Sequence, residues 1–225
     1  MEELRLRLME IQTRIERAAQ KSGRMGKEIT LLAVSKMVDN TAVRQAYDLN
    51  ICDFGENRVQ EFNNKIQSLP QARWHLIGRL QTNKVKDVVG KAYLIHSVDR
   101  WPLAQEIDKR GQYLGVKVPV LLQVNISGEE SKAGLHAGEV HNFLQSVGEL
   151  TSLQVLGFMT IAVQSTNPEE SRPIFQELAA LKNMMSNKTY SNVELKYLSM
   201  GMSQDYEVAI EEGANIVRIG SALFI

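Results

Sequence analysis

The stretch LLAVSKMVDN, residues 31–40, joins an apolar segment to a lone lysine. Residues 29–35 (ITLLAVS) carry almost no polar side chain, which is typical of a strand that is buried on both faces. Lys36 follows directly at the end of this segment. Every buried strand ends in polar sequence, so a lysine at this position does not by itself indicate a functional role. The alternative is that Lys36 has a chemical role, and the rest of the chain decides between the two.

Composition excludes several classes of function. The 225 residues include 26 Lys+Arg and 26 Asp+Glu, so the formal net charge is zero and offers no electrostatic basis for nucleic acid or an anionic membrane as the main partner. The single cysteine, Cys52, excludes an intrachain disulfide and fits a reducing compartment. No apolar run reaches the length of a signal peptide or a transmembrane helix. We therefore expect a soluble, cytoplasmic protein.

Eight strand-like segments alternate with amphipathic, helix-like segments. The predicted strands span residues 29–35, 51–56, 73–78, 93–98, 118–125, 153–161, 193–200 and 216–220. The predicted helices between them span residues 41–49, 58–69, 82–90, 101–115, 137–150, 168–186 and 203–213, and apolar side chains at helical spacing predict an extra N-terminal helix over residues 2–22.

This alternation is typical of a parallel sheet. Eight strands fit a single (β/α)8 TIM barrel, an α/β domain that spans residues 1–225. A doubly wound open sheet is the alternative. No GxGxxG motif follows the first strand, where a dinucleotide-binding fold would place it.

Polar or small residues gather at the C-terminal ends of the predicted strands, where barrel enzymes place their chemistry. An ordinary transition from strand to loop explains some of them. It explains poorly the residues that lie inside or beside apolar runs, which are Lys36, Asn57, His75 and Arg218.

Two predicted turns combine glycine with serine: SMGMSQDY at 199–206 and RIGSAL at 218–223. Glycine lets backbone N–H groups approach an anion, and the loops after strands 7 and 8 of such barrels commonly bind phosphate. The eighth strand neighbours the first in a closed barrel, so this phosphate site and Lys36 would serve one ligand. A lysine amine condenses with an aldehyde, and pyridoxal 5'-phosphate (PLP) carries both an aldehyde and a phosphate.

Six motifs resemble the YggS/PROSC family of PLP-binding proteins. They are AVSK (33–36), FGENRVQE (54–61), WHLIGRLQTNK (74–84), GFMTI (157–161), LSMGMSQDY (198–206) and VRIGSALF (217–224), and they extend over nearly the whole chain. The resemblance implies a barrel like the N-terminal domain of alanine racemase. It also implies a role in PLP (vitamin B6) homeostasis, in which the protein carries or buffers the cofactor without established catalysis. Family members typically continue with a glycine and a short basic tail, whereas this sequence ends at Ile225.

The resemblance further implies roles for individual residues. Lys36 would form the Schiff base, and Arg218 would face the pyridine nitrogen. The phosphate would be held by four residues: Ser199, Gly201, Gly220 and Ser221. Ser203 and Gln204 would assist at the start of the following helix. Three residues would line the ring: Asn57, His75 and Met159.

The expected place of Arg218 bears on catalysis. Arginine only donates hydrogen bonds, so the pyridine nitrogen would stay unprotonated and the ring would be a poor electron sink. A racemase also needs an acid/base group on the opposite face of its substrate, which the resemblance places in a second domain and a dimer partner of alanine racemase. We therefore expect a PLP-binding regulatory or carrier protein, a monomer with PLP-dependent apoenzymes as acceptors. A PLP-dependent amino-acid racemase is the alternative, and residual racemase activity stays open.

Other features are less specific. Residues 126–135 form a Gly- and Ser-containing loop, either a mobile flap over the ring or an ordinary connection. The basic segment 78–91 is best explained as a solvated helix face. The four histidines show no metal-binding spacing, and Cys52 and the pair Met184-Met185 are expected to pack in the interior.

Overall fold

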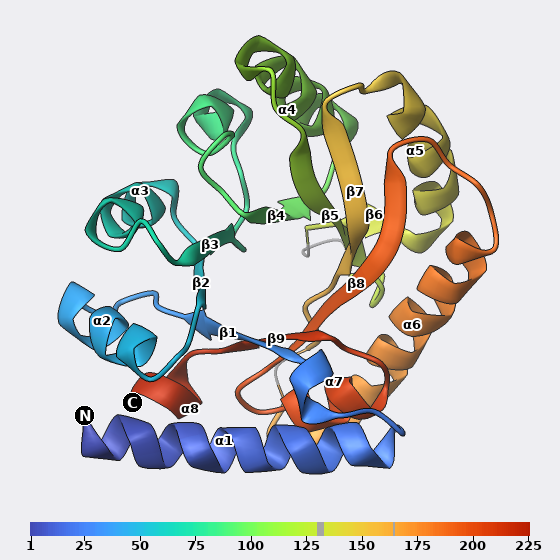
Figure 1. The fold of residues 1–225 in the computed structure, drawn as a ribbon. Coiled ribbons are helices and arrows are strands. Elements are labelled where there is room, and N and C mark those ends of the chain that lie inside the picture. Colours follow the sequence, from blue (N-terminus) through green and yellow to red (C-terminus); the bar gives the residue numbers. More distant parts are fainter. Residues whose placement is uncertain (130–132, 164) are drawn as a thin grey trace.

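Eight parallel strands form a closed barrel surrounded by helices (Figure 1). The computed structural model describes residues 1–129, 133–163 and 165–225. The strands follow the order β4–β3–β2–β1–β9–β8–β7–β5, and pairing of β4 with β5 completes the ring. The predicted (β/α)8 barrel with its extra N-terminal helix is confirmed, and the open sheet is excluded.

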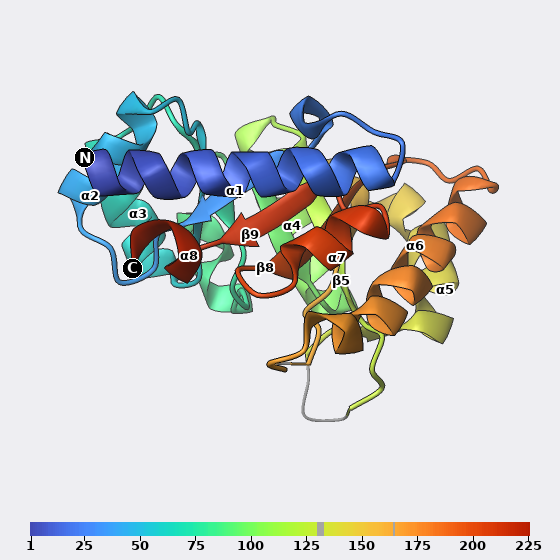
Figure 2. The ribbon, with the colours of Figure 1, turned by 90° about the horizontal axis from the view of Figure 1, so that it is seen from below.

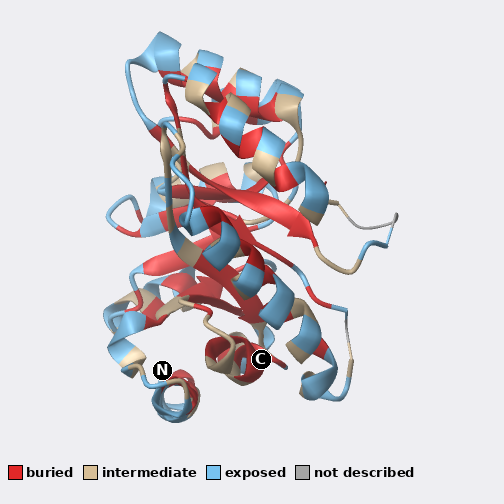
Figure 3. Ribbon diagram, turned by 90° about the vertical axis from the view of Figure 1, so that its right-hand side faces the viewer, coloured by how far each residue is buried: buried red, intermediate tan, exposed pale blue. Residues whose placement is uncertain are grey.

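The barrel strands lie where the apolar segments predict them. They are β1 (Thr30–Val34), β2 (Asp53–Glu56), β3 (Arg73–Leu76), β4 (Leu94–Val98), β5 (Val118–Asn125), β7 (Leu153–Met159), β8 (Val193–Met202) and β9 (Ile216–Ile219). A short strand that the sequence did not predict, β6 (Leu135–His136), pairs with the end of β5. Most strand residues are buried, because helices cover the outer face and side chains fill the interior (Figure 3).

Helices connect consecutive strands on the outside of the barrel. The α-helices are α1 (Glu2–Lys21), α2 (Asn40–Asp48), α3 (Val59–Ser68), α4 (Trp101–Leu114), α5 (Val140–Ser146), α6 (Arg172–Ser186), α7 (Tyr206–Glu211) and α8 (Ser221–Phe224). Short 3-10 helices are η1 (Gly26–Glu28), η2 (Thr82–Asp87), η3 (Ala137–Glu139), η4 (Val147–Glu149) and η5 (Pro168–Ser171). None of the described helices combines the length and apolar character needed to cross a membrane.

The connection after β3 is a 3-10 helix, η2, and not an α-helix. The buried valines of the segment 82–90, which are Val85 in η2 and Val88 and Val89 just after it, are β-branched and therefore favour the α-helix less than unbranched residues do. Gly90 then ends the segment with a φ of +86°. The predicted helix at 82–90 is thus present in a shorter and tighter form.

Helix α1 covers the side of the barrel where the first and last strands pair. It packs against α7 and α8, which lie beside it in two perpendicular views (Figures 1 and 2). Its apolar stripe is buried there: Leu4, Leu8, Ile11, Ile15, Ala18 and Ala19. Ion pairs from Arg14 to Glu207 (2.5 Å) and from Lys21 to Glu211 (2.7 Å) join α1 to α7.

Two packing expectations are wrong. Cys52 lies just before β2 and is exposed, because the strand begins one residue later, at Asp53. Met184 is 59 % exposed while Met185 is buried, since neighbouring residues of a helix point about 100° apart and only one of them faces the barrel.

A bulge in β7 leads to a first prediction. Gly157 has a φ of +145°, and a Cβ atom on it would lie 2.0 Å from the carbonyl oxygen of Tyr197 on β8. We expect Gly157→Ala to lower the free energy of unfolding by at least about 2 kcal/mol, because the added methyl group forces these two strands apart. Gly138→Ala is the matched control, since a Cβ there meets nothing within 4 Å. Urea denaturation measures both variants, and equal stability would contradict this account of the bulge.

Candidate functional site

Lys36 lies in a tight turn at the C-terminal end of β1. The carbonyl of Ser35 accepts a hydrogen bond from the backbone N–H of Val38 (3.0 Å), which closes the turn. Met37, inside the turn, has a φ of +62° and is fully exposed. A positive φ is uncommon for any residue other than glycine and redirects the chain abruptly. The lysine side chain is exposed, although its backbone is anchored next to a buried strand.

A buried ion pair fixes the strand ends on either side of Lys36. Lys65, on α3, donates to Glu56 Oε1 (2.6 Å) and to the carbonyl oxygen of Ser35. The Ser35 hydroxyl donates to the same carboxylate oxygen (2.6 Å). These three side chains, which we call the Lys65 clamp, are at most 3 % exposed. Because Ser35 and Glu56 immediately precede Lys36 and Asn57, the clamp determines where both residues leave the barrel.

Sequence reasoning missed the Lys65 clamp, because a lysine in an amphipathic helix is usually a surface residue. The spacing of Lys65 from its apolar neighbours nevertheless indicates burial. Lys65 follows Phe62 by three residues and precedes Leu69 by four, so it lies on the buried face of α3. A charge at such a position requires a buried partner.

Arg218 lies on β9 with its guanidinium inside the barrel. Its Nη1 donates to the carbonyl oxygen (2.7 Å) and the hydroxyl (2.8 Å) of Ser199, and its Nη2 donates to the carbonyl oxygen of Thr160 (2.8 Å). Burial lowers the pKa of Arg218 to about 10, although the charge of Asp205 opposes this, so the guanidinium stays protonated at neutral pH. Within the described residues, no carboxylate lies at ion-pair distance from it.

The turns after β8 and β9 meet at one hydroxyl group. Ser203 Oγ accepts hydrogen bonds from the backbone N–H groups of Gly220 and Ala222, both at 3.3 Å. An oxygen atom that receives two convergent N–H groups occupies the kind of environment that a phosphate oxygen takes. The residues present therefore fit a phosphate group.

Two glycines make these turns possible. Gly201 has a φ of +88°, and a Cβ on it would lie 2.6 Å from the Cβ of Ala209. A Cβ on Gly220 would lie 3.1 Å from the carbonyl oxygen of Val34, at the end of β1. The turn after β9 is thus packed directly against the strand that leads to Lys36.

The predicted site residues fall into two groups in the structure. One group lies at the strand ends and in the turns: Lys36, Asn57, Gly201, Gly220 and Ser221. The other group is buried inside the barrel: His75, Met159, Ser199 and Arg218. Met159 belongs to an apolar cluster of the interior, and both ring nitrogens of His75 are hydrogen-bonded, to Asp53 and to His96. Ser203 is half-buried, and Gln204 is exposed.

The loop at 126–135 is described only in part, since residues 130–132 of this predicted flap lie outside the described residues. Its described ends bond to the barrel, through Asn125 Nδ2 to the carbonyl oxygen of Glu129 (2.8 Å) and through Gln123 Nε2 to that of Ala133 (2.9 Å). The two interpretations of the sequence, a mobile flap and an ordinary connection, both stay open.

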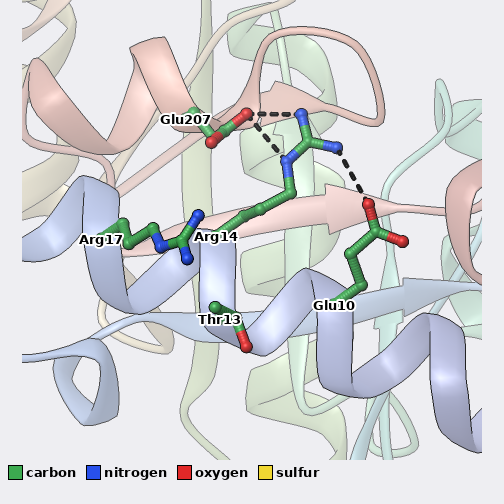
Figure 4. Close-up of a pocket in the computed structure, with 5 residues that line it drawn as sticks. All are labelled: Glu10, Thr13, Arg14, Arg17 and Glu207. Atoms are coloured by element: carbon green, nitrogen blue, oxygen red, sulfur yellow. Dashed lines mark hydrogen bonds and ion pairs between the residues drawn. The ribbon is translucent and has the colours of Figure 1, made fainter.

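A surface pocket lies away from the strand ends, between α1 and α7. It is lined by Glu10, Thr13, Arg14, Arg17 and Glu207 (Figure 4). The Arg14 guanidinium lies between the two carboxylates and pairs with both. We do not assign a ligand to this pocket, because its central charges already neutralise one another. The described part of the chain also contains no cluster of side chains suited to a metal ion.

Comparison with known proteins agrees with this geometry. The sequence matches the alanine racemase N-terminal domain family over residues 6–225. It is 46 % identical over 220 residues to a pyridoxal phosphate homeostasis protein of Aquifex aeolicus, which covers 97 % of this chain and 96 % of that protein. The chain belongs to the family of pyridoxal phosphate homeostasis proteins. The resemblance carried by the six motifs is thereby confirmed.

Solved structures of similar sequence share the fold of this family member. A crystal structure from Bifidobacterium adolescentis superposes with a TM-score of 0.94 at 33 % identity, covering 99 % of this chain and 95 % of that one. PipY of Synechococcus elongatus, crystallised with PLP bound, superposes with a TM-score of 0.79 at 34 % identity, covering 94 % of this chain and 100 % of that one.

The Lys65 clamp leads to a second prediction. We expect Lys65→Met to lower the free energy of unfolding by about 3–5 kcal/mol, because it leaves the buried Glu56 carboxylate without its cation. The second oxygen of that carboxylate, Oε2, is buried without a hydrogen-bond partner among the described residues, so little else compensates the charge. Lys91→Met, which removes an exposed lysine bonded to Asn63, is the matched control and should change stability by less than about 0.5 kcal/mol.

Chemical denaturation of both variants measures this difference. In the double variant Lys65→Met/Glu56→Gln, the loss should be smaller than in Lys65→Met alone, since no unpaired charge remains buried. Additive effects of the two substitutions would show that Lys65 and Glu56 do not stabilise the fold as a pair.

Proposed function

We propose that this protein binds PLP at the C-terminal mouth of its barrel and acts in PLP homeostasis by carrying or buffering the cofactor. One observation carries the proposal: the turn after β9, with its two convergent N–H groups, packs against the end of the strand that leads to Lys36. An exposed amine and a phosphate-compatible turn therefore open on one mouth. PLP supplies an aldehyde that condenses reversibly with a lysine amine. The PLP bound to PipY, a relative of similar fold, supports the same assignment.

The residues at the mouth then take distinct roles. Lys36 would carry the covalent link, and the Lys65 clamp would fix the backbone from which it extends. The backbone N–H groups of Gly220 and Ala222 would bind the phosphate, together with the turn at Gly201 and the hydroxyl groups of Ser203 and Ser221. The hydroxyl of Ser199, which the sequence predicted for the phosphate, is bonded to Arg218 and His96 and would instead act at the arginine. Asn57, Met159 and His75 would contribute to the surroundings of the ring.

Arg218 would bind the pyridine nitrogen. A guanidinium has five N–H donors, and the bonds to Ser199 and Thr160 use at most three of them, so donors remain for the cofactor. With its pKa at about 10, Arg218 is charged at neutral pH and cannot accept a proton from the ring nitrogen. It would therefore leave this nitrogen unprotonated, and an unprotonated ring is a weaker electron sink.

This arrangement favours a carrier over a catalyst. Racemisation needs an acid/base group on each face of the substrate, and beyond Lys36 the described mouth offers no residue that we can assign to the second role. An exposed lysine at an open barrel end also leaves the cofactor accessible to an acceptor. We therefore infer a monomeric, cytoplasmic protein whose acceptors are PLP-dependent apoenzymes.

The covalent link provides the third prediction. Protein incubated with PLP and reduced with borohydride should carry one cofactor on Lys36, as peptide mass spectrometry would show. Lys36→Ala should abolish this adduct yet retain weaker, reversible binding, because the phosphate-binding turn is unchanged. Lys117→Ala, an exposed lysine just before β5 at the opposite end of the barrel, is the control and should be labelled like the unaltered protein. An adduct on another lysine, or on none, would overturn the site assignment.

The proposed transfer of PLP to acceptor enzymes provides the fourth prediction. Protein loaded with PLP should restore activity to a PLP-depleted transaminase, whereas borohydride-reduced protein should not, because its cofactor cannot leave. Neither preparation should racemise alanine at a sustained rate. Steady racemisation by protein free of contaminating enzymes would instead support the alternative of a PLP-dependent amino-acid racemase.

A further inference from the structure

A single line of hydrogen bonds runs through the barrel interior from Arg218 to Asp53. Arg218 Nη1 contacts Ser199 Oγ at 2.8 Å, and this oxygen lies 2.9 Å from His96 Nδ1. His96 Nε2 lies 2.9 Å from His75 Nδ1, and His75 Nε2 lies 3.1 Å from Asp53 Oδ1. The line connects five side chains from β9, β8, β4, β3 and β2, which are separated in sequence and meet only in the closed barrel.

With both rings neutral, the carboxylate end fixes the direction of every bond. Asp53 only accepts, so His75 carries its proton on Nε2 and accepts on Nδ1 from His96 Nε2. His96 Nδ1 is then an acceptor and takes the hydroxyl proton of Ser199, whose oxygen accepts from Arg218. The geometry is consistent with both rings being neutral and both being protonated on Nε2.

The surroundings agree with neutral rings. His75 and His96 are at most 1 % exposed. Burial lowers the pKa of His75 more strongly than its hydrogen bond to Asp53 raises it. Burial also lowers the pKa of His96 well below its usual range, and electrostatic interactions with His75 and Arg218 lower it further. At the far end, Arg73 pairs with the Asp53 carboxylate through two nitrogens (2.7 and 2.5 Å).

The line differs from the rest of the interior, which is filled by apolar side chains such as Leu32, Leu94 and Leu121. Buried polar groups cost stability unless each one is hydrogen-bonded, and here each member between the two charged ends has a partner on both sides. Arg218 is a buried cation with no carboxylate at ion-pair distance among the described residues. Aligned hydrogen bonds polarise one another, so the line holds the Ser199 hydroxyl in the orientation in which it accepts from that cation.

We propose that His96 and His75 are positioning residues for Arg218: Asp53 fixes the tautomers of the two rings, and the rings keep the Ser199 hydroxyl oriented to accept from Arg218. Neither histidine need touch the cofactor for this. This inference deepens the proposed function. Its part about cofactor binding rests on the proposal that Arg218 contacts bound PLP. The tautomers of the two rings are independent of that contact.

The first test is therefore made without the cofactor. The protein has only four histidines, so their side-chain nitrogen resonances can be assigned by NMR with single substitutions. At neutral pH, His75 and His96 should both be neutral and protonated on Nε2. A protonated ring, or a proton on Nδ1 of either residue, would overturn the direction of the line whatever the protein binds.

The second test measures the effect on PLP with a matched pair of variants. His96→Gln keeps one acceptor and one donor and should retain PLP affinity and the absorption maximum of the bound cofactor. His96→Leu removes both and should weaken PLP affinity roughly two- to tenfold, the range expected for one lost hydrogen bond, and should shift the absorption maximum. Unchanged affinity and absorption in a folded His96→Leu protein would overturn the positioning role.

Should His96→Leu fail to fold, Asp53→Asn tests the same line with little change in shape, because an amide can donate as well as accept and no longer fixes the tautomer of His75. It should weaken PLP binding in the same direction, and an unchanged affinity would overturn the role of Asp53. If the unaltered protein does not bind PLP at all, the proposed function fails, while the NMR result still decides the direction of the line.

Discussion

The parallel pairing of β1 with β9 is the contact on which the site depends. Thr30 pairs with Ile216 and Leu32 with Arg218, so the first and last barrel strands run side by side. This register places the turn at Gly220 against Val34, two residues before Lys36. In an open sheet with another strand order, the lysine and the phosphate-compatible turn would not lie on neighbouring strands. Helix α1 packs against α7 and α8 beside this seam and thereby links the N-terminal segment to the stability of the site (Figure 2).

Two buried charges near the mouth are handled in different ways. Lys65 meets its carboxylate directly, and the resulting clamp holds the ends of β1 and β2. Arg218 has carbonyl oxygens and a hydroxyl as its nearest partners, and its link to a carboxylate runs through two neutral histidines. A direct ion pair would occupy the donors of Arg218 and reduce its charge toward a ligand. The indirect arrangement leaves the guanidinium charged, oriented and able to donate further.

Sequence reasoning predicted the fold well, because buried parallel strands are apolar on both faces and stand out from the helices between them. It also singled out Lys36 and Arg218, whose roles stay predictions, since an isolated cation in or beside an apolar run is conspicuous. It did not find the Lys65 clamp or the line from Asp53 to His96, because those contacts join different strands and depend on the register of a closed barrel. Cys52 was misplaced for a local reason: the strand predicted from residue 51 begins two residues later, at Asp53.

The central claim is that closure of the barrel places both ends of one cofactor in a single mouth. A crystal structure of the protein incubated with PLP and reduced with borohydride tests it most directly. The account predicts continuous density from the Lys36 side chain into the cofactor, with the phosphate at the turn that contains Gly220 and Ala222 and the ring nitrogen at Arg218. Density attached to Lys36 with the phosphate elsewhere, or a cofactor bound outside this mouth, would contradict it.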